Sequence, residues 1–307
     1  MSVPDAFSVL PGDERYPALL GATPSPPRLE VRGSLHPSDG LAIAIVGSRR
    51  PTPYGVEVAE SLGAELAARG VTIVSGLARG IDTAAHRGAL AGGGRTLAVL
   101  GSGIDVVYPP ENRDLLGEIE RQGAVVSEFP RGTAPRPYNF PARNRTIAGL
   151  ALGVVVVEAS ERSGALITAS LAADLGREVF AVPGRVTSEV SRGPHGLLRD
   201  GAILVRDWAD VVQELPEPWR HAVRTDTAGV AEPDHTLNET EATVLAVLKP
   251  DEPLHIEELT VLVALTPGRL ASALLTLELG GRVRQLEGQR WLAVPTRSAG
   301  PMRSRRR

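Results

Sequence analysis

From Leu41 onward the sequence repeats one pattern: a short apolar run, a turn that contains glycine, and a segment whose apolar residues have helical spacing. The first repeat consists of LAIAIVG at 41–47 and a helical segment from Tyr54 to Arg69, which Gly70 ends. Strands that alternate with helices predict a mostly parallel sheet with helices on both faces. Ligands of such α/β folds bind outside the carboxyl ends of the strands, so we expect the functional residues there.

Changes in composition divide the chain into five predicted segments. The core, 41–214, carries the alternating pattern, and residues 1–40, rich in proline and glycine, are predicted to form an N-terminal arm that lies on it. Residues 215–236 contain several prolines and no period, which is typical of a linker. Three predicted helices and a hairpin at 237–296 indicate a small winged-helix domain, and 297–307 form a basic tail.

The composition excludes several kinds of site. The chain has no cysteine, which rules out disulfides and thiolate metal sites, and its six histidines are not paired at ligand spacing. Gly101-Ser102-Gly103 lacks the third glycine of the dinucleotide fingerprint, and no Walker-type phosphate loop is present. Because no apolar run reaches about 18 residues and the N-terminus lacks a leader pattern, we expect a cytoplasmic protein without cofactor, metal or membrane contact.

The stretch from Ser127 to Leu150 combines cations with aromatic rings in a chain whose formal net charge is -3. Cations that follow a phosphate backbone, placed between rings on which bases stack, are typical of single-stranded nucleic acid binding. The alternative is a proline-rich surface loop whose rings pack beneath it. The arginines are Arg131, Arg136, Arg143 and Arg145, and the rings are Phe129, Tyr138 and Phe140.

Polar and glycine residues follow the predicted strands, at the edge where ligands are expected. Glycine lets a backbone approach a ligand, and free amides at helix N-termini attract anions, although glycine turns are normal in any such sheet. Arg49 directly follows a buried strand and is expected in the crevice, or else paired with Asp82 or Glu158. The residues predicted to bind nucleic acid are Gly47, Ser48, Arg49, Ser75, Gly76, Arg79, Gly101, Ser163, Gly164 and Thr168 in these turns, and Arg136, Tyr138, Phe140, Arg143, Asn144 and Arg145 in the basic stretch.

Two pairs of titratable residues are candidates for acid–base chemistry. Asp82 and His86 are four residues apart at a predicted helix start, where a capping aspartate with a supporting histidine is the favoured interpretation. Glu128 and Glu158 end two different strands, and the arginines near them favour ion pairing. We therefore predict no catalytic residues.

The predicted winged helix is acidic. From Leu237 to Pro295 it has eight acidic and five basic residues, and its predicted recognition helix carries Arg269 against Glu278. Because a helix that recognises duplex DNA is normally basic, this argues against duplex recognition. Contact with a protein, or with nucleic acid through the segment from Arg282 to Arg290, fits the charges better.

Several blocks of the core resemble the bacterial DNA-processing protein A family (DprA, also called Smf), among them IAIVGSRRPTPYG, VTIVSGLARGIDTAAHRGAL and FPARNRTIAGLALGVVVVEAS. The resemblance covers roughly 41–212. It implies an extended Rossmann-like core that binds single-stranded DNA, forms a homodimer and helps to load RecA recombinase during natural transformation. It also implies protection of the incoming strand, contact with single-strand-binding protein, and no hydrolase or transferase activity. The matched family residues are GSR at Gly47, Ser48 and Arg49, RNR at Arg143, Asn144 and Arg145, the loop cation at Arg136, and the stacking ring at Phe140 or Tyr138.

The chain departs from the family pattern in three places. The 40 residues before Leu41 are too few for the helical domain that many members carry there. Pro110 stands where members often have a lysine, which removes one expected phosphate contact. The asparagine of a late glycine turn is replaced near Gly193-Pro194-His195, so that turn is expected to differ in shape.

Two other functions stay open. The fold also resembles that of nucleotide-metabolising, lysine decarboxylase-like phosphoribohydrolases, but the turn from Ser163 to Thr168 lacks their double glycine and following glutamate. The second alternative is a scaffold that binds RecA without binding DNA.

Overall fold

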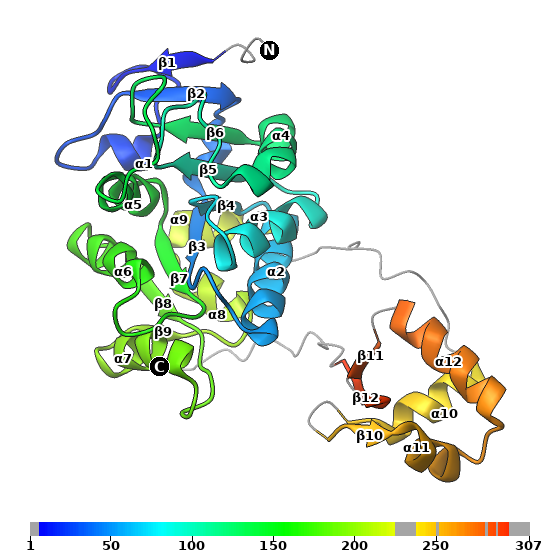
Figure 1. Cartoon of the computed structure of the whole chain (residues 1–307). Helices are drawn as coiled ribbons and strands as arrows, with labels where there is room; N and C mark the ends of the chain where they lie inside the picture. The colour runs from blue at the N-terminus through cyan, green and yellow to red at the C-terminus, as the bar shows by residue number, and fades with distance from the viewer. Residues whose placement is uncertain (1–5, 225–237, 250–251, 280–281, 287, 295–307) are drawn as a thin grey trace. The chain divides into compact units, whose positions relative to one another are not determined.

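The alternating pattern folds into a nine-stranded sheet in a computed structural model that describes residues 6–224, 238–249, 252–279, 282–286 and 288–294 (Figure 1). The strand order is β1-β2-β6-β5-β4-β3-β7-β8-β9. Every pair among β3 to β9 is parallel, so the predicted mostly parallel, Rossmann-like α/β sheet is confirmed. The strands are β1 Phe7–Val9, β2 Leu29–Gly33, β3 Ala42–Val46, β4 Thr72–Ser75, β5 Thr96–Leu100, β6 Ala124–Ser127, β7 Gly153–Val156, β8 Glu178–Ala181 and β9 Ile203–Leu204.

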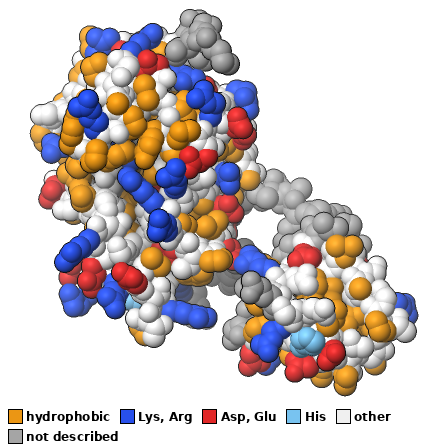
Figure 2. Space-filling model, in the orientation of Figure 1, with side chains coloured by type: hydrophobic (Ala, Val, Ile, Leu, Met, Phe, Trp, Pro, Cys, Tyr) orange, Lys and Arg blue, Asp and Glu red, His pale blue; other side chains and the backbone are white. Residues whose placement is uncertain are grey.

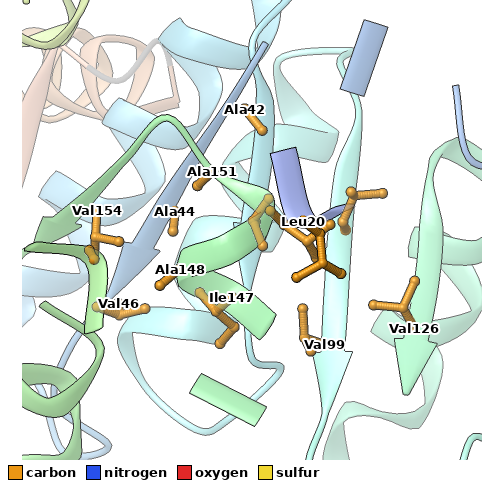
Figure 3. Packing of buried hydrophobic residues seen from close by; sticks show 14 of the residues in the cluster. Leu20, Ala42, Ala44, Val46, Val99, Val126, Ile147, Ala148, Ala151 and Val154 are labelled. Carbon is orange, nitrogen blue, oxygen red and sulfur yellow. The ribbon is translucent and has the colours of Figure 1, made fainter. Parts of the chain in front are cut away.

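Helices cover both faces of this sheet, with α5 and α6 on one side and α2 and α3 on the other (Figure 1). Strand β3 shows why, because its side chains alternate between two apolar cores. Ala44 and Val46 pack in the core that contains Ile147 of α5, seen in Figure 3, whereas Ile43 packs with Leu66 of α2. The helices are α1 Ala18–Gly21, α2 Pro53–Ala68, α3 Ile81–Ala91, α4 Arg113–Gln122, α5 Asn139–Leu150, α6 Gly164–Asp174, α7 Arg192–Arg199, α8 Trp208–Gln213 and α9 Glu217–Ala222.

The N-terminal segment is part of the sheet, which corrects the prediction of an arm that lies on the core. Strand β2 pairs antiparallel with β6, with Val31 opposite Val126, and β1 extends the sheet by pairing with β2. Leu29 and Val31 are buried in the same core as β3. The alternation of buried residues in β2 is too short, within a stretch rich in proline and glycine, to be recognised as a strand.

The folded core also extends into the first part of the predicted linker, so the linker begins later than expected. Leu215 and Val223 are buried in the core beneath α2, and α9 lies between them, so the first unit continues at least to Arg224. Contacts divide the chain into units Met1–Val230 and Ala231–Arg307. The rest of the linker, at 225–237, and the basic tail at 297–307 lie outside the described residues.

The second unit has the helices and hairpin expected of a winged helix. Its described residues form α10 Glu239–Val247, α11 Ile256–Val263 and α12 Pro267–Leu279, and a sheet in the order β10-β12-β11. The strands are β10 Leu254–His255, β11 Val283–Leu286 and β12 Arg290–Ala293. Strand β10 was not expected, because a strand of two residues has no detectable period.

In the described part of the chain, no single helix is long and apolar enough to cross a membrane. Helices α11 and α12 satisfy length and composition only together, as a pair bent by 108°, and both supply buried residues to the core of the second unit.

Candidate nucleic-acid interface

An open groove of about 720 Å³ lies where the strand order of the sheet reverses. The chain leaves β3 toward α2 on one side of this point and leaves β7 toward α6 on the other, so the two turns diverge and leave a crevice between them. The first turn contributes Gly47, Ser48 and Arg49 to the lining, and the second contributes Ser163 and Gly164. The groove therefore lies at the strand carboxyl ends, where the sequence predicts ligand binding.

Helix α5 forms one wall of the groove, and its first residue fixes its position. Asn139 Nδ2 donates hydrogen bonds to the carbonyl oxygens of Gly101 and Ala134. Residues one helical turn apart share a face, so the anchored helix directs Phe140, Arg143 and Asn144 toward the groove that they line. The predicted helix start near Pro141 is thus within two residues of the observed one.

Phe140 is the centre of a cluster of cations and rings. The guanidinium carbon of Arg49 lies over its ring at 5.0 Å from the centroid, and that of Arg143 lies at 5.6 Å. The ring of Tyr108 lies at 6.2 Å, tilted by 42°. A side chain at Gly101 would start 2.8 Å from the Phe140 ring, so the ring occupies space that only glycine leaves free.

Arg143 lies under the groove rather than within it, since it is only 4% exposed. Its Nη1 donates a hydrogen bond to the carbonyl oxygen of Val99 and lies where a Cβ of Gly76 would be, at 1.4 Å. The neighbouring carboxylate of Asp82 accepts hydrogen bonds from the amides of Gly76 and Ala78. Arg143 thus compensates a buried carboxylate, whereas the side chain of Arg49 is exposed.

Burial controls the ionisation of this pair. Removal from water raises the pKa of Asp82, and the nearby charges of Arg143 and Arg49 only partly oppose this effect. Removal from water also lowers the pKa of Arg143 from its ordinary value. The groove floor therefore holds two buried titratable groups that attract each other, and the exposed cations of the lining, Arg49 and Arg50, lie in the β3–α2 turn.

A recess next to the groove is lined by residues of the other turns that were predicted to bind nucleic acid. Gly76, Arg79 and Gly101 line it together with Tyr108. Arg79 forms an ion pair with Glu111, and both side chains are about half exposed. The recess and the groove share Arg49, Phe140 and Arg143, so they form one continuous surface.

Four predicted residues are not part of this surface. Ser75 is buried, and its hydroxyl donates to the carbonyl oxygen of Ile45. Arg136 donates to the hydroxyl of Tyr138, which is 68% exposed, and neither residue lines the groove or the recess. Arg145 is exposed on α5 near Glu128, and it too lines neither cavity. Thr168, in contrast, lines the groove, although it is only 1% exposed.

The two candidate acid–base pairs are not assembled. His86 Nδ1 shares a hydrogen bond with the hydroxyl of Thr96 at 2.7 Å, and burial lowers the pKa of His86 to about 3. Glu158 accepts hydrogen bonds from the amide and the hydroxyl of Thr52, and within the described ranges it forms no ion pair with an arginine, so the ion pair expected for it is wrong. Among the described residues, no cluster of histidine, aspartate or glutamate could hold a metal ion.

Tyr108 and Arg50 also line the groove, and neither was predicted from the sequence. Tyr108 follows β5 by several residues, in a proline-containing turn, so its position at the same sheet edge was not evident from the pattern. Arg50 adjoins Arg49 and continues the exposed charge of that turn. Both residues come from turns that follow β-strands of the parallel sheet, which is the signal that could have identified them.

Comparison with known proteins supports the resemblance found in the sequence. Residues 8–216 match the family model of DNA recombination-mediator protein A, which covers more than half of the chain. The chain belongs to the DprA/Smf family. Residues 229–289 match the DprA winged helix domain, so the fold expected for both parts is confirmed.

Curated DprA and Smf proteins share the core with this chain. Protein Smf of Escherichia coli is 46% identical over 67% of this chain and 56% of its own length. DNA processing protein DprA of Streptococcus pneumoniae is 44% identical over 68% of this chain and 74% of its own length. The chain spans about half the length of the Smf proteins of Escherichia coli and Synechocystis, at 56% and 50%.

Two solved DprA structures share the fold. DprA from Streptococcus pneumoniae superposes with a TM-score of 0.65 at 44% identity, covering 69% of this chain and 74% of that one. DNA processing protein A from Helicobacter pylori, whose structure concerns its single-stranded DNA binding mode, superposes with a TM-score of 0.61 at 29% identity. That match covers 69% of this chain and 98% of the Helicobacter pylori chain.

Proposed function

We propose that the chain is a noncatalytic, single-stranded DNA-binding recombination mediator whose binding site is the groove with its adjoining recess. The observation that carries the proposal is the exposed guanidinium of Arg49 over the ring of Phe140, with Tyr108 beside it, at the carboxyl ends of parallel strands. A cation next to rings supplies both contacts that a single strand offers, phosphate charge and base faces. The single-stranded DNA binding reported for the Helicobacter pylori relative supports this assignment.

Within this site the residues have different roles. Arg49 and Arg50 contact phosphate, Phe140 and Tyr108 stack with bases, and the hydroxyl of Ser163 contacts the backbone further along the groove. Arg136 and Tyr138 extend the path as an exposed pair beyond the lining. Gly76 and Gly101 leave free the space that Arg143 and Phe140 occupy, and Gly47 allows the close approach of Ile81 and of the carbonyl oxygen of Glu158.

The test is a titration of labelled oligo(dT) and of a matched duplex against the full chain at several salt concentrations. The slope of log affinity against log salt is expected to be about -0.7 per neutralised phosphate. Arg49→Ala should lower affinity by about 1 to 3 kcal/mol and make the slope shallower by roughly one unit. Arg121→Ala, an exposed arginine on α4, is the matched control and should bind like the parent. If Arg49→Ala also binds like the parent, the groove is not the site.

We further propose that the chain acts in the cytoplasm as a homodimer, protects incoming single strands and helps RecA to displace single-strand-binding protein from them during natural transformation. Family membership supports this role. RecA strand exchange on DNA coated with single-strand-binding protein should be accelerated by the chain and not by Arg49→Ala, while sedimentation gives the mass of the complex. Equal exchange with and without the chain would exclude the mediator role.

The phosphoribohydrolase alternative has a separate outcome. Release of free base from nucleoside monophosphates by the purified chain would establish an enzyme. The hydrogen-bonded positions of His86 and Glu158 leave neither as a free acid or base in the groove, which supports the noncatalytic proposal.

A further inference from the structure

The winged helix contains a helix-turn-helix whose surface does not suit DNA. Helices α11 and α12 meet at a bend of 108°, and Ala264 ends α11 in the left-handed conformation. In duplex-binding proteins with this motif, the second helix enters the major groove and the first crosses the phosphate backbone. Here α11 begins with Glu257 and Glu258 in its first turn, where a phosphate backbone would be repelled.

The same helix exposes large apolar side chains. Val261 is 80% exposed and Leu262 is 58% exposed, while Leu259 and Val263 of the same helix are buried in the core of the unit. The core is therefore complete without the two exposed residues. On α12, Leu275 is also 56% exposed.

Acidic and apolar side chains on α11 lie one helical turn apart. Val261 follows Glu257, and Leu262 follows Glu258, by four residues, which places each carboxylate next to an apolar side chain on the helix surface. Figure 2 shows hydrophobic and acidic side chains next to one another on the visible face of this unit. In the described part of the chain neither carboxylate is paired with an arginine or lysine; Glu258 accepts from the amide of His255, and Glu257 lies 3.8 Å from its ring.

We propose that this acidic-apolar face of α11, formed by Glu257, Glu258, Val261 and Leu262, docks a basic amphipathic helix of a partner protein. A partner helix with leucine-like residues on one face and lysine or arginine along its edge would cover the apolar pair and compensate both carboxylates. Charge selects this occupant over two others. Duplex DNA would be repelled, and a symmetric contact with a second copy would pair two faces that both carry negative charge.

The test uses the full chain and a synthetic amphipathic peptide of about 14 residues, with leucine on one face and lysine and arginine along its edges. A second peptide has the same leucines and glutamate at the edges. Fluorescence anisotropy should show binding of the basic peptide and at least about tenfold weaker binding of the acidic one. Equal binding of both peptides would overturn the proposal.

Two double variants locate the site. Glu257→Gln with Glu258→Gln removes both charges but keeps the side-chain acceptor that caps the helix at His255. Val261→Ser with Leu262→Ser removes exposed apolar area without changing the core. Each should weaken the basic peptide about tenfold, whereas Asp114→Asn with Glu118→Gln, which removes two exposed carboxylates from α4, should not. Unchanged affinity in either α11 variant would overturn the proposal.

The other occupants have their own outcomes. If the Val261 and Leu262 variant lowers the mass of the full chain in sedimentation, the face is a contact between copies and the proposal is wrong. If the same variant weakens duplex DNA binding, the face contacts nucleic acid and the proposal is also wrong. Both outcomes are independent of the groove, because Arg49→Ala is expected to leave peptide binding unchanged.

Discussion

The groove of the first unit and the helix-turn-helix of the second are opposite in charge, although both belong to architectures that bind nucleic acids in many proteins. The groove places Arg49 and Arg50 at the ends of strands next to Phe140, and arginine side chains lie across the visible face of this unit in Figure 2. The helix-turn-helix places Glu257 and Glu258 where phosphate would pass. An architecture therefore provides the place for a site, and the side chains at that place decide the ligand.

Removal of Arg143 should lower the stability of the protein, because this arginine is buried beneath the groove, whereas Arg49 is exposed. Arg143→Ala leaves Asp82 buried without its partner and is expected to cost about 3 to 5 kcal/mol of unfolding free energy. Urea unfolding measures this cost. The control, Arg145→Ala, changes an exposed residue of the same helix and should cost less than about 0.5 kcal/mol. Equal stabilities of the two variants would show that the buried pair does not support the groove.

Acid should destabilise the first unit through His86. In the folded state the pKa of His86 is about 3, below the ordinary value of 6.5 that applies to the unfolded chain. The unfolded state therefore binds a proton at His86 more readily than the folded state does. The stability from neutral His86 is therefore present above pH 6.5 and is lost as pH falls toward 3. His86→Gln should be less stable than the parent at pH 7, and the difference should shrink by about 2 kcal/mol between pH 6.5 and pH 5. A difference that stays constant over this range would contradict the assignment.

Charge reversal on α11 should allow the helix-turn-helix to bind DNA, because its surface would then carry exposed cations as the groove does. Glu257→Lys with Glu258→Lys removes the repulsion of phosphate and adds two cations, so duplex affinity at low salt is expected to rise about tenfold. The same change should leave oligo(dT) binding in the groove within a factor of about two. Filter binding with both DNAs measures the two effects, and an unchanged duplex affinity would show that charge is not what excludes DNA from this motif.

Breaking the ion pair between Arg79 and Glu111 is expected to have the smallest effect, a modest rise in affinity for single-stranded DNA. Glu111→Gln releases Arg79, at the recess beside the groove, from its carboxylate partner. Affinity for oligo(dT) should rise about two- to fivefold. The slope of log affinity against log salt should become steeper by less than the change expected for one additional neutralised phosphate. Arg79→Ala tests the converse, since it should not bind more tightly than the parent. A tighter Arg79→Ala variant would mean that Arg79 hinders the strand.

The sequence predicted the sheet and the location of the groove, but it could not separate buried from exposed arginines. The continuous apolar run of β3 and the helical period of the segment that follows it are strong local signals, and residues of both pack in the cores. Arg143 and Arg49 look alike in sequence, yet only the packing of Gly76 and Asp82 against Arg143 shows that its charge is internally compensated. Pairing of β2 with β6 joins residues about 95 positions apart, which no local pattern specifies.

The position of Arg49 over the Phe140 ring has a consequence for how a strand enters the groove. A base that stacks on the ring face covered by Arg49 must displace the guanidinium, because both need the same aromatic surface. The displaced side chain then becomes free to turn toward the phosphate next to that base. In the proposed complex, stacking of a base on Phe140 and contact of Arg49 with the neighbouring phosphate would therefore occur together, because the base takes the place of the guanidinium on the ring.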